Sequence, residues 1–184
     1  IYDAEVAITV LNASTGFTIE QAHFEDNGVH VASMNSNYAI KNSTFKSLKP
    51  IPNNNPNASF LNNRETTSPM IYAENSHLSS LEACTFDQRD DNSPGSPNTT
   101  TAIELQNTGV IGHGYLDIFD NFEYGVYARN CTGLFFEYIH FGTPYIEPTI
   151  RYDYQEPFSN NGLYFKDCKG VFVGEVSLQP SNYG

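Results

Sequence analysis

The chain has 184 residues, of which 39% are apolar, and it carries a formal net charge of −12. This length and composition predict a single domain that can bury a core. The nine Lys and Arg residues form no patch, and phosphate backbones need clustered basic side chains, so nucleic acid is excluded as an expected partner. Since no apolar run approaches the length of a membrane span, we also expect no membrane insertion.

Six stretches of the chain share one pattern of short strands. Each opens with alternating apolar residues, passes Asn or Asp and a small residue, and then continues with further alternating residues up to a large apolar side chain. In chain order they are Ile8–Phe24, Val29–Phe45, Ile71–Phe86, Ile103–Ile118, Val126–Phe141 and Leu163–Leu178. A recurring unit of short strands indicates a solenoid, because one unit cannot bury its apolar face alone.

The last two stretches show the unit most clearly. GVYARNCTGLFFEYIHF (125–141) aligns with GLYFKDCKGVFVGEVSL (162–178) without a gap. Strand alternation directs Val126 and Ala128 inward, and the residues from Asn130 onward turn the chain. Three short strands and two corners would make one coil of roughly 22 residues. We therefore predict an all-β, right-handed parallel β-helix solenoid of about six such coils.

The first corner of each unit carries a polar residue suited to a tight turn. These residues are Asn12, Asn75, Asn107, Asn130 and Asp167. Stacked coils would place them in one column, where side-chain amides can hydrogen-bond from coil to coil. The second stretch departs from this pattern at 34–37, with one extra residue, and the fourth has a poor middle strand at 111–113.

The three cysteines have no metal-ligand spacing, so we predict neither a metal site nor another cofactor. Cys131 and Cys168 occupy one position in consecutive units, and Cys84 falls where Ile139 and Val176 point inward. We interpret all three as small core residues. A Cys131–Cys168 disulfide is the alternative, because adjacent coils lie about 4.8 Å apart.

Three insertions separate the repeats, at 46–69, 87–101 and 142–161. Each follows the closing apolar residue of a unit, so all three are predicted to be long loops that leave one corner and form a wall beside the first strands. The whole range 1–184 is interpreted as a single β-helix segment of a longer protein.

This arrangement resembles the right-handed parallel β-helix of the pectin-lyase-like superfamily, with its parallel β-helix repeats, over residues 8 to 178. Phrases such as NNGLYFKDCKGVFV (160–173) resemble repeats in large secreted surface proteins of Bacteroidota, many of them exported by the type IX system. The resemblance implies an extracellular or cell-surface location. It also implies two kinds of partner: a polysaccharide or cell-surface glycan, and the rest of a larger chain or a secretion or surface assembly.

Two columns of outward side chains are predicted on the sheet of first strands. The first column is Thr9, His30, Tyr72, Glu104, Tyr127 and Tyr164, and the second is Leu11, Ala32, Glu74, Gln106, Arg129 and Lys166. Tyr rings offer apolar faces to sugars, and charged groups offer hydrogen bonds to hydroxyls. We therefore predict adhesion or glycan binding, with Tyr72, Tyr127, Tyr164 and Lys166 as ligand-binding residues. Plain exposed Tyr on a sheet remains the other interpretation.

A polysaccharide lyase or glycoside hydrolase is the alternative function. Glu74 and Glu104 would lie in adjacent coils, with carboxylates within about 5–9 Å of each other, and Arg129 is the candidate cation beside them. The sequence contains no complete catalytic constellation, which favours binding over catalysis. A structural spacer, or a segment of a phage tailspike, is the third alternative.

Overall fold

The computed structural model of the chain is all-β in the residues that it describes, which are 1–2, 4–46, 66, 69–87, 101–119, 122–141 and 161–178. The first sheet contains, in spatial order, β1 (Val6–Leu11), β4 (Val29–Met34), β7 (Ile71–Glu74), β9 (Thr101–Gln106), β11 (Tyr124–Arg129) and β13 (Asn161–Lys166). The second sheet contains β2 (Phe17–Glu20), β5 (Asn37–Lys41), β8 (His77–Asp87), β10 (Gly109–Phe119), β12 (Thr132–Phe141) and β14 (Lys169–Leu178). Two short strands, β3 (His23–Glu25) and β6 (Thr44–Lys46), pair with each other, and β6 also pairs with β8.

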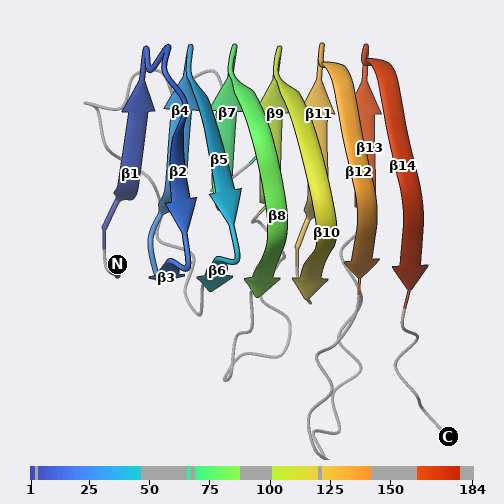
Figure 1. Ribbon diagram of the computed structural model, residues 1–184. Coiled ribbons are helices and arrows are strands. Elements are labelled where there is room, and N and C mark those ends of the chain that lie inside the picture. The colour runs from blue at the N-terminus through green and yellow to red at the C-terminus, as the bar shows by residue number, and fades with distance from the viewer. Residues whose placement is uncertain are drawn as a thin grey trace, which may run out of the picture.

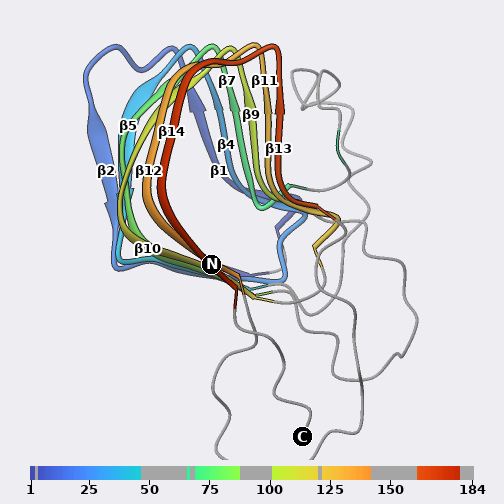
Figure 2. The ribbon, with the colours of Figure 1, turned by 90° about the vertical axis from the view of Figure 1, so that its right-hand side faces the viewer.

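All pairs of neighbouring strands are parallel, and the chain alternates between the two sheets. After each excursion into the second sheet it returns to the first sheet, beside the strand that it left. The strands of the two sheets run in opposite directions (Figure 1). Viewed along the row of strands, successive passes of the chain overlie one another around a common interior (Figure 2). Equivalent residues of the repeats therefore become neighbours across the sheets.

The strand pairing corrects the predicted alignment of the second repeat. Ile8 pairs with Val31, not with Val29, so this repeat begins two residues later than its sequence pattern indicated. With this register Asn35 takes the corner position, and its side-chain Nδ2 donates a hydrogen bond to Oδ1 of Asn12 at 3.1 Å. The expected departure at 34–37 is therefore wrong.

One corner column of left-handed residues closes every strand of the first sheet. Its members have φ between 47° and 54°, and they are Asn12, Asn35, Asn75, Asn107, Asn130 and Asp167. Asn and Asp tolerate this conformation better than other residues that carry a Cβ, because their short polar side chains bond to the local backbone. The position therefore selects the residue type that the sequence pattern revealed.

A second column lies at the same corner, one residue further along the chain, and consists of small residues that carry a hydroxyl or thiol. The Oγ of Ser76 donates to the carbonyl of Glu74 at 2.9 Å and accepts the N–H of Ser36 at 3.2 Å. Ser36, Thr108, Cys131 and Cys168 likewise donate to the carbonyl two residues before them. Side chains thus satisfy backbone groups at a buried corner, where an unpaired group would be costly.

The predicted division into three short strands holds only in the first passes of the chain. β2 and β3 are separate, as are β5 and β6, but β8, β10, β12 and β14 each run through the second corner as one strand. In β8 and β10 a single left-handed residue absorbs the bend, Ala83 with φ 48° and Gly114 with φ 67°. A poor middle strand was expected at 111–113; β10 continues through these residues as one strand, and its pairing shifts register there with both neighbours.

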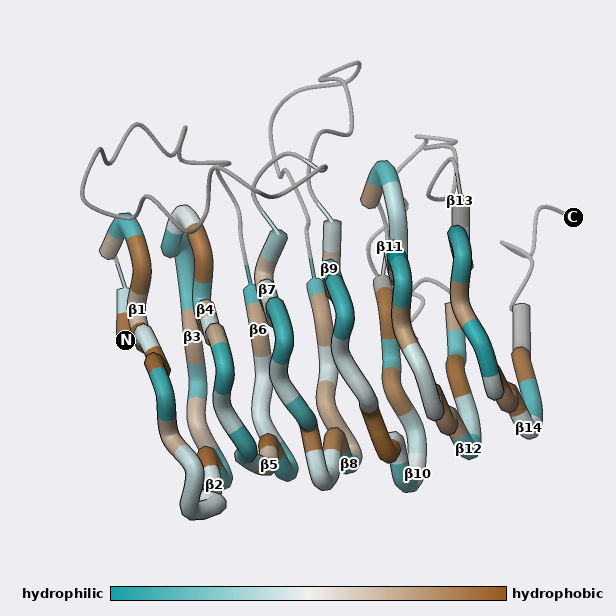
Figure 3. Tube along the Cα trace, turned by 90° about the horizontal axis from the view of Figure 1, so that it is seen from above, coloured by the Kyte–Doolittle hydropathy of each residue, from teal (hydrophilic) through white to brown (hydrophobic). Residues whose placement is uncertain are grey.

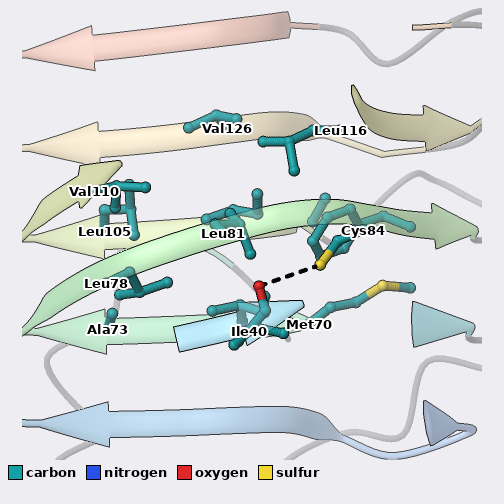
Figure 4. Packing of buried hydrophobic residues seen from close by; sticks show 14 of the residues in the cluster. Ile40, Met70, Ala73, Leu78, Leu81, Cys84, Leu105, Val110, Leu116 and Val126 are labelled. Atoms are coloured by element: carbon teal, nitrogen blue, oxygen red, sulfur yellow. Dashed lines mark hydrogen bonds between the residues drawn. The ribbon is translucent and has the colours of Figure 1, made fainter. Parts of the chain in front are cut away.

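The core lies between the sheets and is built from columns of like residues. Phe24, Phe45 and Phe86 stack with ring centroids 5.0 and 4.9 Å apart. Hydrophilic and hydrophobic residues alternate along the strands (Figure 3), as strand geometry requires when one face is buried. Cys84 is fully buried in the core beside Leu81, and its thiol contacts the carbonyl oxygen of Ile40 at 3.9 Å (Figure 4).

The three cysteines lie in the predicted rows. Strand pairing joins Cys84 to Leu116, Leu116 to Ile139 and Ile139 to Val176. Cys131 and Cys168 follow the paired residues Arg129 and Lys166 by two positions each. All three thiols are free.

The three predicted loops lie almost entirely outside the described residues. Each interrupts the chain between a strand of the second sheet and a strand of the first: 46–69 between β6 and β7, 87–101 between β8 and β9, and 142–161 between β12 and β13. Thr66 is the one residue inside the first of these segments, before Pro69, that the structure describes.

Candidate functional site

The outer face of the first sheet carries two neighbouring columns of side chains. Strand pairing joins Thr9, Ala32, Tyr72, Glu104, Tyr127 and Tyr164 in one column. The other contains Leu11, Met34, Glu74, Gln106, Arg129 and Lys166. These are the predicted columns except in β4, where Ala32 and Met34 replace His30 and Ala32. We call the pair of columns the outer strip.

His30 was predicted to point outward and instead points into the core. Its ring lies 5.9 Å from the rings of both Phe24 and Phe45. The cause is an irregularity of the backbone, because the amides of His30 and Val31 both donate to the carbonyl of Met70, at 2.9 and 3.0 Å. His30 and Val31 then lie opposite the single residue Met70, as in a β-bulge, and the alternation of inward and outward side chains breaks at that point.

Much of the outer strip is buried, although exposure was predicted for all of it. Tyr72 and Glu104 are fully buried, and Tyr127 is nearly so. Tyr72 packs with Val29 and Ala32 in a second apolar cluster, separate from the core between the sheets. The sequence pattern could not show this, since alternation identifies the outer face of a strand but not what covers that face.

Thr66, which is held by Glu104, is part of what covers the outer strip. The Oε2 of Glu104 accepts hydrogen bonds from both the backbone N–H and the hydroxyl of Thr66, in the segment between β6 and β7, and the Oε1 of Glu104 accepts one from Nε2 of Gln106 at 2.8 Å. A carboxylate with several donors is satisfied although it is buried. Glu104 therefore fastens Thr66 to the outer strip, and its burial places it away from any dissolved substrate.

Glu74, the other predicted carboxylate, is half-buried and accepts a hydrogen bond from the hydroxyl of Tyr72 at 3.0 Å. The two acids lie on adjacent strands but in different columns, because Glu74 pairs with Gln106 and Glu104 pairs with Tyr72. Arg129 is half-buried one strand further along. In this arrangement both carboxylates act as acceptors for neighbouring side chains.

Three tyrosines form a ring cluster on β11 and β13, at the end of the outer strip. Tyr127 and Tyr164 stack with centroids 5.0 Å apart and planes at 11°. Tyr124 meets both edge-on, at 5.2 and 5.7 Å. Tyr164 is exposed, with 38% of its surface accessible, and Lys166 beside it is also exposed. We call Tyr124, Tyr127 and Tyr164 the tyrosine cluster.

Two phenols of the tyrosine cluster, those of Tyr124 and Tyr127, stay protonated at neutral pH. Burial is the main cause that raises the pKa of both, and the neighbouring Tyr164 adds to it. Neutral phenols both donate and accept hydrogen bonds. Sequence analysis missed Tyr124, which lies three residues before Tyr127 and therefore falls outside the alternation that identified the strip.

Within the described part of the chain, no three His, Cys, Asp or Glu side chains gather as ligands for a metal ion. The same residues contain no helix that is long and apolar enough to cross a membrane. Comparison with known proteins adds no relative: no protein-family model matches the chain, and neither do any curated protein or solved structure.

Proposed function

We propose that this chain is a right-handed parallel β-helix of about six coils, one for each strand of the first sheet, of the pectin-lyase-like kind. Parallel pairing throughout both sheets, the alternation of the chain between them and the Asn column at one corner support this architecture. The three insertions would leave the corner at which the chain enters the first sheet.

We further propose that the segment is secreted or displayed on a cell surface, where it binds glycans in adhesion. The observation that carries this proposal is the tyrosine cluster, in which the exposed Tyr164 lies beside the exposed Lys166. A ring edge and face with phenol and ammonium donors nearby suits a sugar, whose hydroxyls alternate with apolar C–H surfaces. The extracellular location is supported by the sequence resemblance to surface proteins of Bacteroidota.

A glycan array, followed by calorimetry on any glycan that binds, tests the proposal. Tyr164→Ala is expected to weaken binding about three- to tenfold, because one aromatic contact contributes about 0.5–1.5 kcal/mol. The matched control is Tyr115→Ala on the outer face of the second sheet, where Tyr115 is 59% exposed and stacks on Tyr138. Equal losses in both variants, or no loss in Tyr164→Ala, would remove the tyrosine cluster as the site.

The rigid-spacer alternative is favoured by one observation, the burial of Tyr72 and Glu104 in the middle of the outer strip. A covered strip presents little surface to a ligand. If the array detects no glycan and the folded protein is otherwise intact, the spacer becomes the better proposal. The lyase or hydrolase alternative would instead require turnover of a polysaccharide, measured as released reducing ends or unsaturated products.

A further inference from the structure

Two thiols lie directly beside each other at the first corner of neighbouring passes of the chain. The residues that flank Cys131 and Cys168 are paired, Arg129 with Lys166 and Thr132 with Lys169. The N–H of Lys169 also donates to the carbonyl of Cys131 at 2.9 Å. In-register parallel strands lie about 4.8 Å apart, so the Cα atoms fall within the range that a disulfide can bridge.

The two thiols also point in the same direction. The Sγ of Cys131 donates to the carbonyl of Arg129 at 3.3 Å, and the Sγ of Cys168 donates to that of Lys166 at 3.3 Å. Each Sγ further lies 3.5 Å from a carbonyl of the preceding pass of the chain, that of Leu105 or Ala128. Both side chains therefore enter the same corner column, one above the other.

Their exposure differs. Cys131 is fully buried, and burial is the main cause that raises the pKa of its thiol to about 11. Cys168 is only partly buried. A dissolved oxidant thus reaches Cys168 before Cys131. Among the described strands, β13 and β14 pair with a neighbour on one side, so a small shift of these strands can bring the Cβ atoms to bonding distance.

We propose that Cys131 and Cys168 are an oxidisable thiol pair that hydrogen peroxide converts into a disulfide. Peroxide first oxidises the Cys168 thiol to a sulfenic acid and releases one water. The Cys131 sulfur then attacks the sulfenic sulfur, the S–O bond breaks, and the hydroxyl leaves with the Cys131 proton as a second water. Two thiols lose two electrons, and peroxide gains them. The bond would anchor β13 and β14 to the strands before them.

The test exposes the folded protein to hydrogen peroxide, blocks remaining thiols with N-ethylmaleimide after unfolding, and maps the peptides by mass spectrometry. The expected result is one linked peptide pair that contains Cys131 and Cys168, with Cys84 as the single alkylated thiol. Amide exchange in 161–178 should also slow several-fold in the oxidised protein. Three alkylated thiols, a link to Cys84, a link between two chains or unchanged exchange would each overturn the proposal.

Serine variants separate this pair from general oxidation. Cys84→Ser should form the bridge as the unaltered chain does. Cys131→Ser is expected to fold, since Ser36 and Ser76 hold the same column position in other passes. In that variant Cys168 loses its partner, so its sulfinic and sulfonic acids should accumulate. If Cys168 gains no more of these products in Cys131→Ser than in Cys84→Ser, the proposal that Cys131 attacks the oxidised Cys168 is contradicted.

Discussion

His30 shows at the scale of a single residue how the core tolerates a polar group. Its Nδ1 lies 2.9 Å from Nδ2 of Asn27, which can donate to it, while Nε2 is buried with no hydrogen-bond partner among the described residues. Burial is the main reason that the pKa of this imidazole falls from 6.5 to about 3. The ring is therefore neutral in the folded protein at physiological pH, and packs against the stacked rings of Phe24 and Phe45 much as a Phe would.

This burial predicts that the protein loses stability in acid. Between pH 6.5 and about 3 the unfolded chain binds a proton at His30 that the folded chain does not, so the free energy of unfolding falls as pH falls through this window. The slope from this residue should approach about 1.4 kcal/mol for each pH unit and vanish above pH 6.5. Urea unfolding at a series of pH values measures it.

The matched variants are His30→Phe and His77→Phe, because His77 is exposed. The first should flatten the slope below pH 6.5, and the second should leave it as it is. An acid slope that is the same in both variants would mean that other groups, the carboxylates above all, cause the loss.

At this scale the sequence predicted which position of the repeat a residue occupies better than it predicted what surrounds that residue in the fold. The equivalence of Cys131 and Cys168 follows from a gapless alignment, and pairing of the flanking residues confirms it. The direction of His30 could not be predicted, since it depends on two amides that share the carbonyl of Met70. The burial of Tyr72 and Glu104 depends on a distant part of the chain, and alternation carries no information about it.

At the scale of elements, the strands are joined by corners whose side chains satisfy the backbone. Ser76 illustrates this: it is buried, donates to Glu74 and accepts from the N–H of Ser36. The hydroxyl thus links two passes of the chain in addition to the bonds of the strands themselves. The same link recurs from Ala13 to Ser36 and from Ser76 to Thr108, and so holds successive passes of the chain in register at this corner.

Ser76→Ala should therefore destabilise the fold by about 1–3 kcal/mol, because it leaves the buried N–H of Ser36 without its acceptor. Ser76→Cys should cost less, since a thiol can still accept the N–H weakly, and Cys131 and Cys168 donate to the carbonyl two residues before them as Ser76 does. The free energy of urea unfolding measures both. Ser14→Ala, at an exposed position near the same corner, is the control and should change stability by less than about 0.5 kcal/mol. Equal effects of Ser76→Ala and Ser14→Ala would show that the hydroxyl column contributes nothing.

Alternation with a period of two predicted nearly all the strands, but it aligned β4 with β1 two residues too early, since Ile8 pairs with Val31 and not with Val29. Val29 and Val31 fit an inward strand better than Val31 and Ser33 do, and only the position of Asn35 points to the observed register. The merging of short strands into β8 and β10 was also missed, because the pattern predicted a break at the second corner, whereas a single left-handed residue, Ala83 or Gly114, bends the chain there without ending the strand. Periodicity fixes which residues are strand, and corner chemistry fixes their register.

At the scale of the whole molecule, the two ends of the strand rows differ. Near the first strands Val10, Ile19 and Phe24 are buried. At the other end the last members of the core columns are open to solvent: Val171 is 36% exposed and Val176 is 43% exposed. Phe172, on the outer face, is also exposed, and it stacks on Phe135 with its other ring face uncovered by any described strand.

Within the described strands, burial along a core column depends on a strand lying on both sides. Cys84, Leu116 and Ile139 are almost completely buried, whereas Val176 in the same column is 43% exposed. Leu116→Ala is therefore expected to lower the free energy of unfolding by about 2–5 kcal/mol, because it leaves a cavity in the core. Val176→Ala should lower it by less, because much of that side chain is already in contact with water. Urea unfolding measures both variants, and equal losses would contradict column packing as the source of stability.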